Sequence, residues 1–220
     1  MVAVPLMALA MPPTQAAAIL LPILVFMDIV VVKTYWGVFD ARALRLLMPA
    51  AMLGIIAGYL VAESMNDDYM RILMGALSLV FGAQNLRGFA SRASTDHHAG
   101  SAAVYGTLAG FTSFSIHAGG PPFTMYLMPK KLSPLLFAGT AGIFFAVVNA
   151  VKLLPYYFLG QFSSENLLYS LALVPLAPVG VKIGHYLVLR SDPGFYYRVI
   201  SFFMLVVGIK LLYDGLVGLW

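Results

Sequence analysis

A glycine–proline cluster interrupts one of the apolar runs of this chain. Gly119-Gly120-Pro121-Pro122 lies inside the run from Ser101 to Met128. Glycine lowers helical stiffness, and each proline removes a backbone donor and clashes with the preceding turn. Inside lipid, backbone groups released in this way must be received by protein or by a water-filled cavity. The cluster therefore predicts either a kinked helix without a ligand or a broken helix at a substrate site.

Composition predicts an all-α polytopic membrane protein. Of the 220 residues, 61% are hydrophobic and 10% are charged, whereas soluble domains carry roughly 25% charged residues. Apolar runs of about 18 residues or more, each long enough to cross a bilayer, recur along the chain. We expect membrane-spanning helices at residues 14–36, 43–62, 69–89, 134–159, 166–189 and 195–219.

Charge and cysteine content exclude several kinds of site. We interpret the net charge of +4 as a loop bias that sets topology, not as binding of nucleic acid. The chain has no cysteine, which excludes disulfides, thiol chemistry and Cys-ligated metals. In the polar segment 90–100, the adjacent His97 and His98 are interpreted as solvated side chains and not as metal ligands. We expect no metal and no cofactor.

The two halves of the chain repeat one another. Each half carries a mid-span Pro-x4-Gly-x3-Gly pattern, which contains a G-x-x-x-G that permits close helix approach, at Pro49, Gly54 and Gly58 and at Pro175, Gly180 and Gly184. An offset of 121 residues places residues 4–7 opposite residues 125–128, Asp28 opposite Asn149, and Tyr35 opposite Tyr156. Internal duplication is typical of secondary transporters. We expect a first repeat at 1–89, a polar cytoplasmic connector at 90–100 and a second repeat at 101–220.

Loop charges indicate how residues 101–130 sit in the membrane. As one kinked span, this segment would leave basic residues evenly divided between the two sides. As a re-entrant hairpin with arms of about ten residues, each roughly half a bilayer long, it moves every later loop to the other side. One face then holds nine basic residues, namely Lys33, Arg42, Arg45, Arg87, Arg92, Lys130, Lys131, Arg190 and Arg198. The other face holds only Arg71, beside Glu63, Asp67, Asp68 and Glu165.

The hairpin reading also fixes the symmetry. Basic residues favour the cytoplasmic side, so the face with nine of them is expected to be cytoplasmic. Each repeat becomes one re-entrant helix plus three spans, and because three is odd, the two repeats are inverted. Residues 2–11, too short to span, then form the returning arm of the first hairpin, whose entering arm is missing. A true start upstream of Met1 is the preferred explanation, and loss of this arm is the alternative.

Residues around the break are suited to binding an anion. Backbone N–H groups and the positive end of a helix that starts after Gly120 would face the membrane centre, and prolines suit its first turn. Gly119 and Gly120 would let an anion approach the backbone. Side-chain donors there are Thr112, Ser113, Ser115 and His117. Their hydroxyls could instead bond carbonyls of their own helix. His117 could also carry protons, or it could be a packed neutral side chain.

Two intramembrane lysines extend the candidate site. An intramembrane Lys is costly, and Lys152 follows Asn149 by one turn on the same helix face. Lys33 has a similar place near the end of the first full span, where snorkelling to the interface is the alternative. Asp28, five residues before Lys33, is expected to neutralise a lysine or relay protons, and an acid would repel an anionic substrate. The coupling set contains Asp28 and His117. The predicted substrate-binding set contains the residues at the break together with these additions, namely Thr112, Ser113, Ser115, His117, Gly119, Gly120, Asn149, Lys152 and Lys33.

Other polar and aromatic residues are given structural interpretations. Lys182, His185 and Lys210 are expected to pair among themselves or to snorkel. Aromatic residues near the span ends are expected to form interfacial belts, at Tyr35, Trp36, Tyr156, Tyr157 and Trp220.

Several glycine-rich motifs resemble the second-half signature of the TauE/SafE family of sulfite exporter-like permeases. In chain order, they are Gly106, Gly110 and Gly119-Gly120-Pro121, then Tyr126-Leu127, then Gly139-Thr140, then Asn149, Lys152, Tyr156 and Gly160. In the first half, Val4-Pro5-Leu6 is similar to the tail of the family's first Gly-rich motif. The resemblance implies transport of sulfite, sulfonates and related small anions across the cytoplasmic membrane. The missing first arm is a departure from the family pattern.

The expected function is a secondary transporter of small sulfur-containing anions in the cytoplasmic membrane. The expected partners are a small anionic substrate and the lipid bilayer, without nucleic acid, and a homodimer is left open. A non-transporting scaffold or assembly protein, or a truncated inactive permease, is the alternative. An intramembrane enzyme is disfavoured, because His117 and Ser115 alone do not make a nucleophile with an oriented base.

Overall fold

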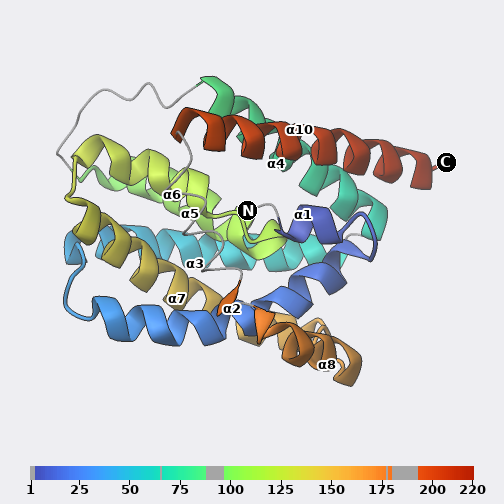
Figure 1. Ribbon diagram of the computed structural model, residues 1–220, viewed down its shortest axis with the longest axis horizontal. Coiled ribbons are helices and arrows are strands. Elements are labelled where there is room, and N and C mark those ends of the chain that lie inside the picture. The colour runs from blue at the N-terminus through green and yellow to red at the C-terminus, as the bar shows by residue number, and fades with distance from the viewer. Residues whose placement is uncertain (1–2, 65, 88–96, 177, 180–192) are drawn as a thin grey trace. The chain divides into compact units, whose positions relative to one another are not determined.

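The computed structural model describes residues 3–64, 66–87, 97–176, 178–179 and 193–220. In this part of the chain all regular structure is helical, which confirms the predicted all-α class. The helices are α1 (Ala3–Met7), α2 (Pro13–Tyr35), α3 (Ala41–Ser64), α4 (Asp67–Arg87), α5 (Ala99–Ile116), α6 (Gly120–Leu127), the 3-10 helix η1 (Met128–Lys130), α7 (Pro134–Phe158), α8 (Ser164–Leu173) and α10 (Pro193–Gly218) (Figure 1).

The long helices coincide with the predicted spans. α2, α3, α4, α7 and α10 occupy five of the six, and the sixth, at 166–189, is described mainly in its first part, as α8. Four described segments are long and apolar enough to cross a membrane, namely Pro13–Tyr35, Ala41–Ala62, Leu135–Phe158 and Ser201–Gly218. α4 is not among them, because polar and charged residues occupy both of its ends.

The helices group into two units that do not follow the halves of the chain. The first unit contains α2 from Leu24 onwards, α3, α5, α6 and α7, and the second contains α1, α2 up to Ile23, α4, α8 and α10. A repeat is a property of sequence and symmetry, whereas these units are defined by packing. The division into repeats at 1–89 and 101–220 therefore stays a prediction.

Within the first unit, α3 and α5 run parallel at very close range. A Cβ on Gly54 would lie 2.1 Å from the carbonyl oxygen of Thr107, and one on Gly110 would lie 2.1 Å from that of Ala51. The glycines of both helices thus let the two backbones approach closely, as small residues permit in membranes. Because the two helices are parallel, α5 starts at the same end of this unit as α3.

α7 runs antiparallel to the second half of α2. Gly139 lies against the carbonyl oxygen of Val38, and Gly142 lies against Val31. α7 therefore begins where α2 ends, next to the start of α3. The backbone N–H of Asp40, just before α3, donates to Thr140 Oγ1 of α7 at 2.9 Å.

The chain reverses between α5 and α6. α5 ends at Ile116, and α6 starts at Gly120 and returns along α5, so that Tyr126 near its end reaches His97, which precedes α5 (Figure 1). We call residues 99–130 the hairpin. Its arms are unequal, with 18 residues in α5 and 8 in α6, so the prediction of two arms of about ten residues is wrong. The longer arm, α5, packs along α3 from Gly106, which contacts Ala50, to Phe114, which contacts Gly58.

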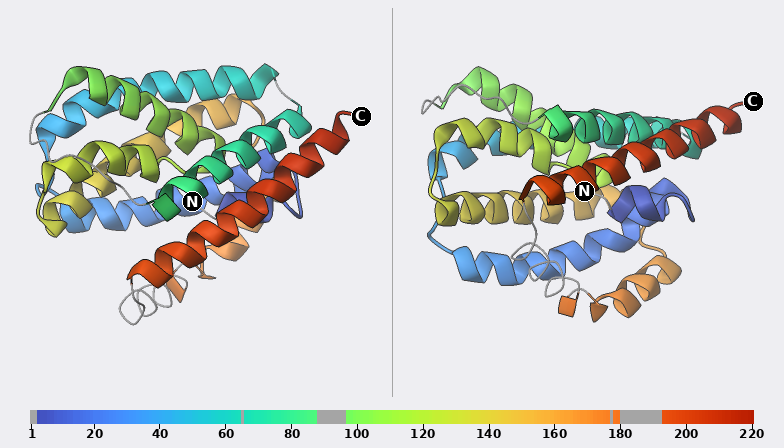
Figure 2. Two further views of the ribbon diagram at one scale, coloured as in Figure 1. Left: turned by 90° about the horizontal axis from the view of Figure 1, so that it is seen from above. Right: turned by 45° about the horizontal axis from the view of Figure 1, so that its top comes forward.

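The second unit is built on an antiparallel pair. α4 and α10 lie side by side in Figures 1 and 2, with Gly75 against the carbonyl oxygen of Gly208. α8 is held to the first half of α2, because Ser170 Oγ lies 2.8 Å from Ile19 O and 2.9 Å from Asn166 O, and Gln15 Nε2 donates to Asn166 Oδ1 at 3.1 Å. Lys210 pairs with Asp214 of its own helix, a partner that the sequence analysis does not name. Gly180, Lys182, Gly184 and His185 lie outside the described residues.

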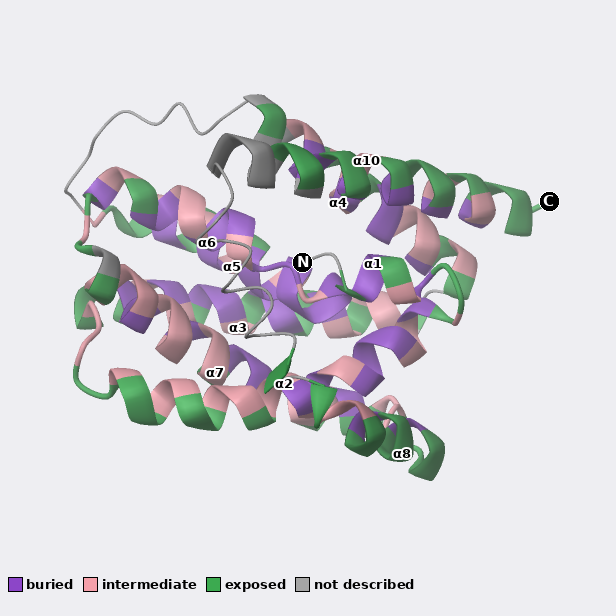
Figure 3. Ribbon diagram, in the orientation of Figure 1, coloured by how far each residue is buried: buried purple, intermediate pink, exposed green. Residues whose placement is uncertain are grey.

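Exposed side chains are largely apolar, as expected for helices in lipid. On α10, Phe202, Val206 and Ile209 are exposed while Met204 and Leu211 are buried, a division that Figure 3 shows along the helix. Trp36, Tyr157 and Trp220 are also exposed, as expected of belt residues. Tyr156 is only 3% exposed. Its prediction as a belt residue is therefore wrong, because its hydroxyl is used inside the protein.

Candidate functional site

The break between α5 and α6 is a tight backbone turn. His117 ends α5 in the left-handed region, with φ 50°, and its N–H donates to Ser113 O at 3.1 Å. The N–H of Ala118 donates to Thr112 O at 3.1 Å. These bonds satisfy the last carbonyls of α5, as left-handed caps do. Gly119 is required here, since a Cβ on it would lie 2.6 Å from Ala109 O and 2.9 Å from Ser113 Cβ.

Lys152 of α7 reaches this turn from the side. Its side chain is completely buried, and Nζ donates to Ser113 O at 2.9 Å and to Ser113 Oγ at 3.1 Å. Nζ also lies 2.7 Å from His117 Nδ1. That nitrogen is 3.2 Å from Ser113 O as well, so it can accept from Lys152 or donate to Ser113 O, but not both at once. The ammonium thus sits at the carboxyl end of α5, where a cation is favoured.

Asn149 and Asp28 lie one turn away from the lysine. Asn149 Nδ2 donates to Asp28 Oδ2 at 2.7 Å. The carboxylate is close enough to Lys152 for the two charges to attract each other, but no carboxylate of the described residues forms an ion pair with Lys152. The site therefore contains a buried basic group that forms no ion pair with a carboxylate of the described residues, while Asp28 accepts a hydrogen bond from Asn149.

Tyr156 also contacts the turn, and it is not among the predicted site residues. Its hydroxyl donates to Phe114 O at 2.7 Å, and its ring stacks on His117 with centroids 6.2 Å apart. The i, i+3, i+7 spacing of Asn149, Lys152 and Tyr156 places all three on one face of α7. That spacing was the signal that could have found it. We call Ser113, His117, Asn149, Lys152 and Tyr156 the tip cluster.

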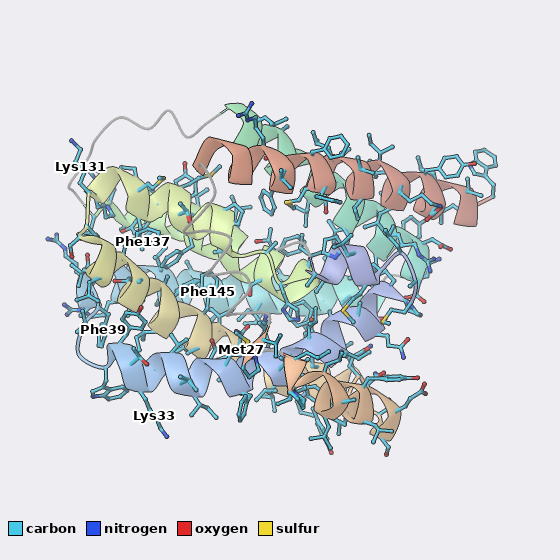
Figure 4. The ribbon with its side chains drawn as sticks, viewed as in Figure 1. Met27, Lys33, Phe39, Lys131, Phe137 and Phe145 are labelled. Atoms are coloured by element: carbon cyan, nitrogen blue, oxygen red, sulfur yellow. The ribbon has the colours of Figure 1, made fainter. Side chains whose placement is uncertain are left out.

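The other predicted site residues are placed around the tip cluster or away from it. Ser115 Oγ donates to Phe111 O at 3.0 Å, and Thr112 Oγ1 lies 2.7 Å from Leu108 O and 3.1 Å from Ala118 O, so both hydroxyls are engaged by backbone carbonyls. Gly120 is the first residue of α6. Lys33 is exposed and points away from α7, so the structure does not bring it to the break (Figure 4).

An aromatic cluster fixes α6 against α7. The ring of Phe123 packs on those of Phe137, Phe144 and Phe145, with centroids 4.8–6.2 Å apart. Figure 4 shows Phe137 and Phe145 on the side of α7 that faces the hairpin. These ring contacts anchor α6 on the first half of α7.

A second polar cluster lies at the opposite end of the hairpin, where α5 begins and α6 ends. His97 Nε2 lies 3.2 Å from Asp40 Oδ2, and His97 Nδ1 lies 3.4 Å from the hydroxyl of Tyr126. Lys130 Nζ stands 4.3 Å over the Tyr126 ring. We call Asp40, His97, Tyr126 and Lys130 the foot cluster. The interpretation of His97 as a solvated residue is wrong, because it folds back onto the loop before α3, whereas His98 is exposed.

The sequence as a whole decides the family. The family model described as "Sulfite exporter TauE/SafE" matches residues 1–211. The chain belongs to the sulfite exporter TauE/SafE family. Its members are membrane permeases, so the chain is a transmembrane transport protein, and the predicted resemblance is confirmed. No curated protein and no solved structure matches the chain. Among the described residues, no group of three His, Asp or Glu side chains could hold a metal ion.

Proposed function

We propose that this TauE/SafE protein is a secondary transporter of small anions, such as sulfite, sulfonates or related sulfur compounds, across the cytoplasmic membrane. The observation that carries the proposal is the position of Lys152. It is completely buried and meets the broken end of α5 at Ser113 and His117. An intramembrane lysine is costly, and such residues usually mark substrate or ion pathways.

The chemistry of the break favours an anion. The ammonium of Lys152 lies at the end of α5, at the turn that leads to the glycines and prolines of α6, and glycine lets a ligand approach the backbone closely. In transporters with discontinuous helices, the N-termini of half-helices near the membrane centre point at the anionic groups of the substrate. Asn149 and Ser113 add neutral donors that can hold an oxyanion without binding it too tightly to leave.

Re-entrant, inverted repeats are part of this proposal. The starts of α3, α5 and α7 and the ends of α2 and α6 gather at one end of the first unit, which supports a hairpin that enters and leaves on the same side. Asp28 and Asn149, equivalent under the offset of 121 residues, bond to each other. Two equivalent residues touch when they lie beside a symmetry axis. We assign the end with Lys33, Arg42, Arg45, Lys130 and Lys131 to the cytoplasm.

Flux measurements in vesicles test the proposal. The purified chain is reconstituted, and uptake of radiolabelled sulfite is followed for wild type, Lys152→Ala and Gly120→Leu. We expect the flux to fall roughly a hundredfold in both variants. Lys152→Ala removes a hydrogen bond to a charged group, which is worth up to about 3 kcal/mol, and in Gly120→Leu the new side chain would block the approach of the anion to the backbone. Lys131→Ala, which removes an exposed lysine, is the control and should transport like wild type. Full flux in both site variants would remove the assignment of the site.

A further inference from the structure

Two polar side chains on α7 lie one turn apart and contact different helices. Asn149 is buried, and its Nδ2 donates to Asp28 Oδ2 of α2 at 2.7 Å. Lys152 is also buried, but its Nζ donates to the carbonyl and hydroxyl oxygens of Ser113 on α5. Asp28 and Lys152 are close enough to attract each other, yet no ion pair links these two described residues. The carboxylate is therefore bound to an amide and not to the neighbouring ammonium.

The register of α2 against α7 shows how near this carboxylate is to the lysine. The two helices are antiparallel, with Val31 against Gly142 and Asp28 bonded to Asn149. Lys152 follows Asn149 by three residues, which is about 4.5 Å along the helix axis. Because a lysine has a flexible stem of four carbons, it can cover that distance. Asp28 could therefore pair with Lys152 if no nearer donor held the carboxylate.

A carboxylate that paired with Lys152 would compete with the substrate. Ionisable side chains inside membrane spans usually pair with one another, and opposite charges attract strongly where water is scarce. The carboxylate is itself an anion, and it is attached to the protein, so it would not need to diffuse to the site. The bond from Asn149 opposes this pairing, because a hydrogen bond to an ionised acceptor is among the strong ones.

We propose that Asn149 is a positioning residue that holds the carboxylate of Asp28 and thereby leaves Lys152 available to the substrate anion. This inference rests on the proposed function and adds a residue that sets the affinity of the site. Asn149 acts on the lysine through Asp28. Its effect on binding therefore depends on the negative charge of Asp28, which a direct contact between Asn149 and the substrate would not require.

Binding of sulfite to the full chain in detergent, measured by calorimetry, tests this role. Asn149→Leu keeps roughly the volume of the side chain but removes the donor, so that Asp28 turns to Lys152. We expect the sulfite affinity to fall about ten- to a hundredfold, the range of a hydrogen bond to a charged group. Asp28→Asn removes the competing charge and should bind sulfite at least as tightly as wild type.

The combined variant separates positioning from direct contact. In Asp28→Asn/Asn149→Leu no carboxylate is left to compete, so the sulfite affinity should return to within about threefold of wild type. A lost substrate contact or damaged packing at Asn149 would not be repaired by a substitution on α2. Asn166→Leu is the matched control, because Asn166 is also buried but its amide donates to a carbonyl, that of Gln161, at 2.7 Å. It should bind sulfite like wild type.

A cycle of unfolding measurements gives a readout that needs no ligand. The midpoint of thermal unfolding is measured for Asp28→Asn, Lys152→Met and both together, in wild type and in Asn149→Leu. Two substitutions interact when their shifts do not add. We expect a larger interaction in Asn149→Leu, where the two charges pair directly, than in wild type.

The outcomes distinguish this inference from the proposed function. If wild type binds and transports sulfite while Asn149→Leu keeps the wild-type affinity, or is not rescued by Asp28→Asn, the positioning role is overturned and the transporter stands. Weaker sulfite binding in Asp28→Asn alone, or an equal interaction of Asp28 with Lys152 in both backgrounds, would overturn it as well. If wild type neither binds nor transports sulfite, the proposed function fails, and the unfolding cycle decides whether Asn149 keeps Asp28 from pairing with Lys152.

Discussion

The two ends of the hairpin each hold a histidine, but the two histidines have opposite partners. At the foot, His97 faces the carboxylate of Asp40 at 3.2 Å. At the tip, His117 faces the ammonium of Lys152 at 2.7 Å. The foot therefore pairs a base with an acid, and the two attract each other as an ion pair when the histidine is protonated. The tip places two basic groups together, and no carboxylate of the described residues forms an ion pair with Lys152.

This difference indicates that the foot stabilises the hairpin, whereas the tip is the end at which we propose that substrate binds. The foot cluster connects the start of α5, the end of α6 and the loop before α3 through side-chain contacts that need no ligand. The tip cluster has a positive group that forms no ion pair within the described residues. We expect substitutions at the tip to affect transport more than folding, unless they change the turn itself.

The largest effect is expected from a change in the turn. In Gly119→Ala, the new Cβ meets Ala109 O and Ser113 Cβ, both part of α5, and the aromatic ring of Phe145 closes the third side. Overpacking of this kind costs about 1–3 kcal/mol, so transport should be lost and the midpoint of thermal unfolding in detergent should fall. Gly100→Ala is the matched control, because nothing lies within 4 Å of its Cβ. Equal stability and flux in both variants would show that the turn is not constrained as described.

A smaller effect is expected at the foot. Asp40 Oδ1 accepts from the N–H groups of Arg42 and Ala43 at the start of α3, and its Oδ2 faces His97. Asn also caps helices well, so Asp40→Asn weakens mainly the contact with His97. We expect a loss of about 1 kcal/mol of stability, with sulfite flux changed by less than about threefold.

A double-mutant cycle isolates the contact at the foot. Thermal unfolding is measured for Asp40→Asn, His97→Asn and the double variant, and the sum of the single effects should exceed the double effect. His98→Asn serves as the control for loss of an exposed histidine. Strict additivity of Asp40→Asn and His97→Asn would mean that the foot cluster does not act as a pair.

The sequence predicts the helices well and their lateral packing less well. Apolar runs locate α2, α3, α4, α7 and α10 because membrane helices must be long and continuous. The position of the break follows from Gly119-Gly120-Pro121-Pro122 alone. The length of α5 does not, since its extra turns depend on Gly106 and Gly110 meeting α3, and contacts between distant segments are not encoded in periodicity.

At the site, the sequence cannot distinguish residues that look alike. Lys33 and Lys152 are both intramembrane lysines by position, yet Lys33 points away from α7 and Lys152 points at the break. Tyr156 was assigned to the belt because it lies near a span end, and the carbonyl of Phe114 that it satisfies becomes exposed only when α5 stops. Such roles depend on backbone groups freed by the turn, which residue types do not reveal.

Direct binding of sulfite tests most simply whether Lys152 is the anion site. Affinity is measured by calorimetry on the full chain in detergent, for wild type, Lys152→Met and the exposed-site control Lys131→Met. Met keeps most of the volume of the lysine stem while removing the charge. We expect Lys152→Met to weaken sulfite binding roughly a hundredfold, as expected for loss of a hydrogen bond to a charged group, and Lys131→Met to bind like wild type. Unchanged affinity in a folded Lys152→Met protein would contradict the account.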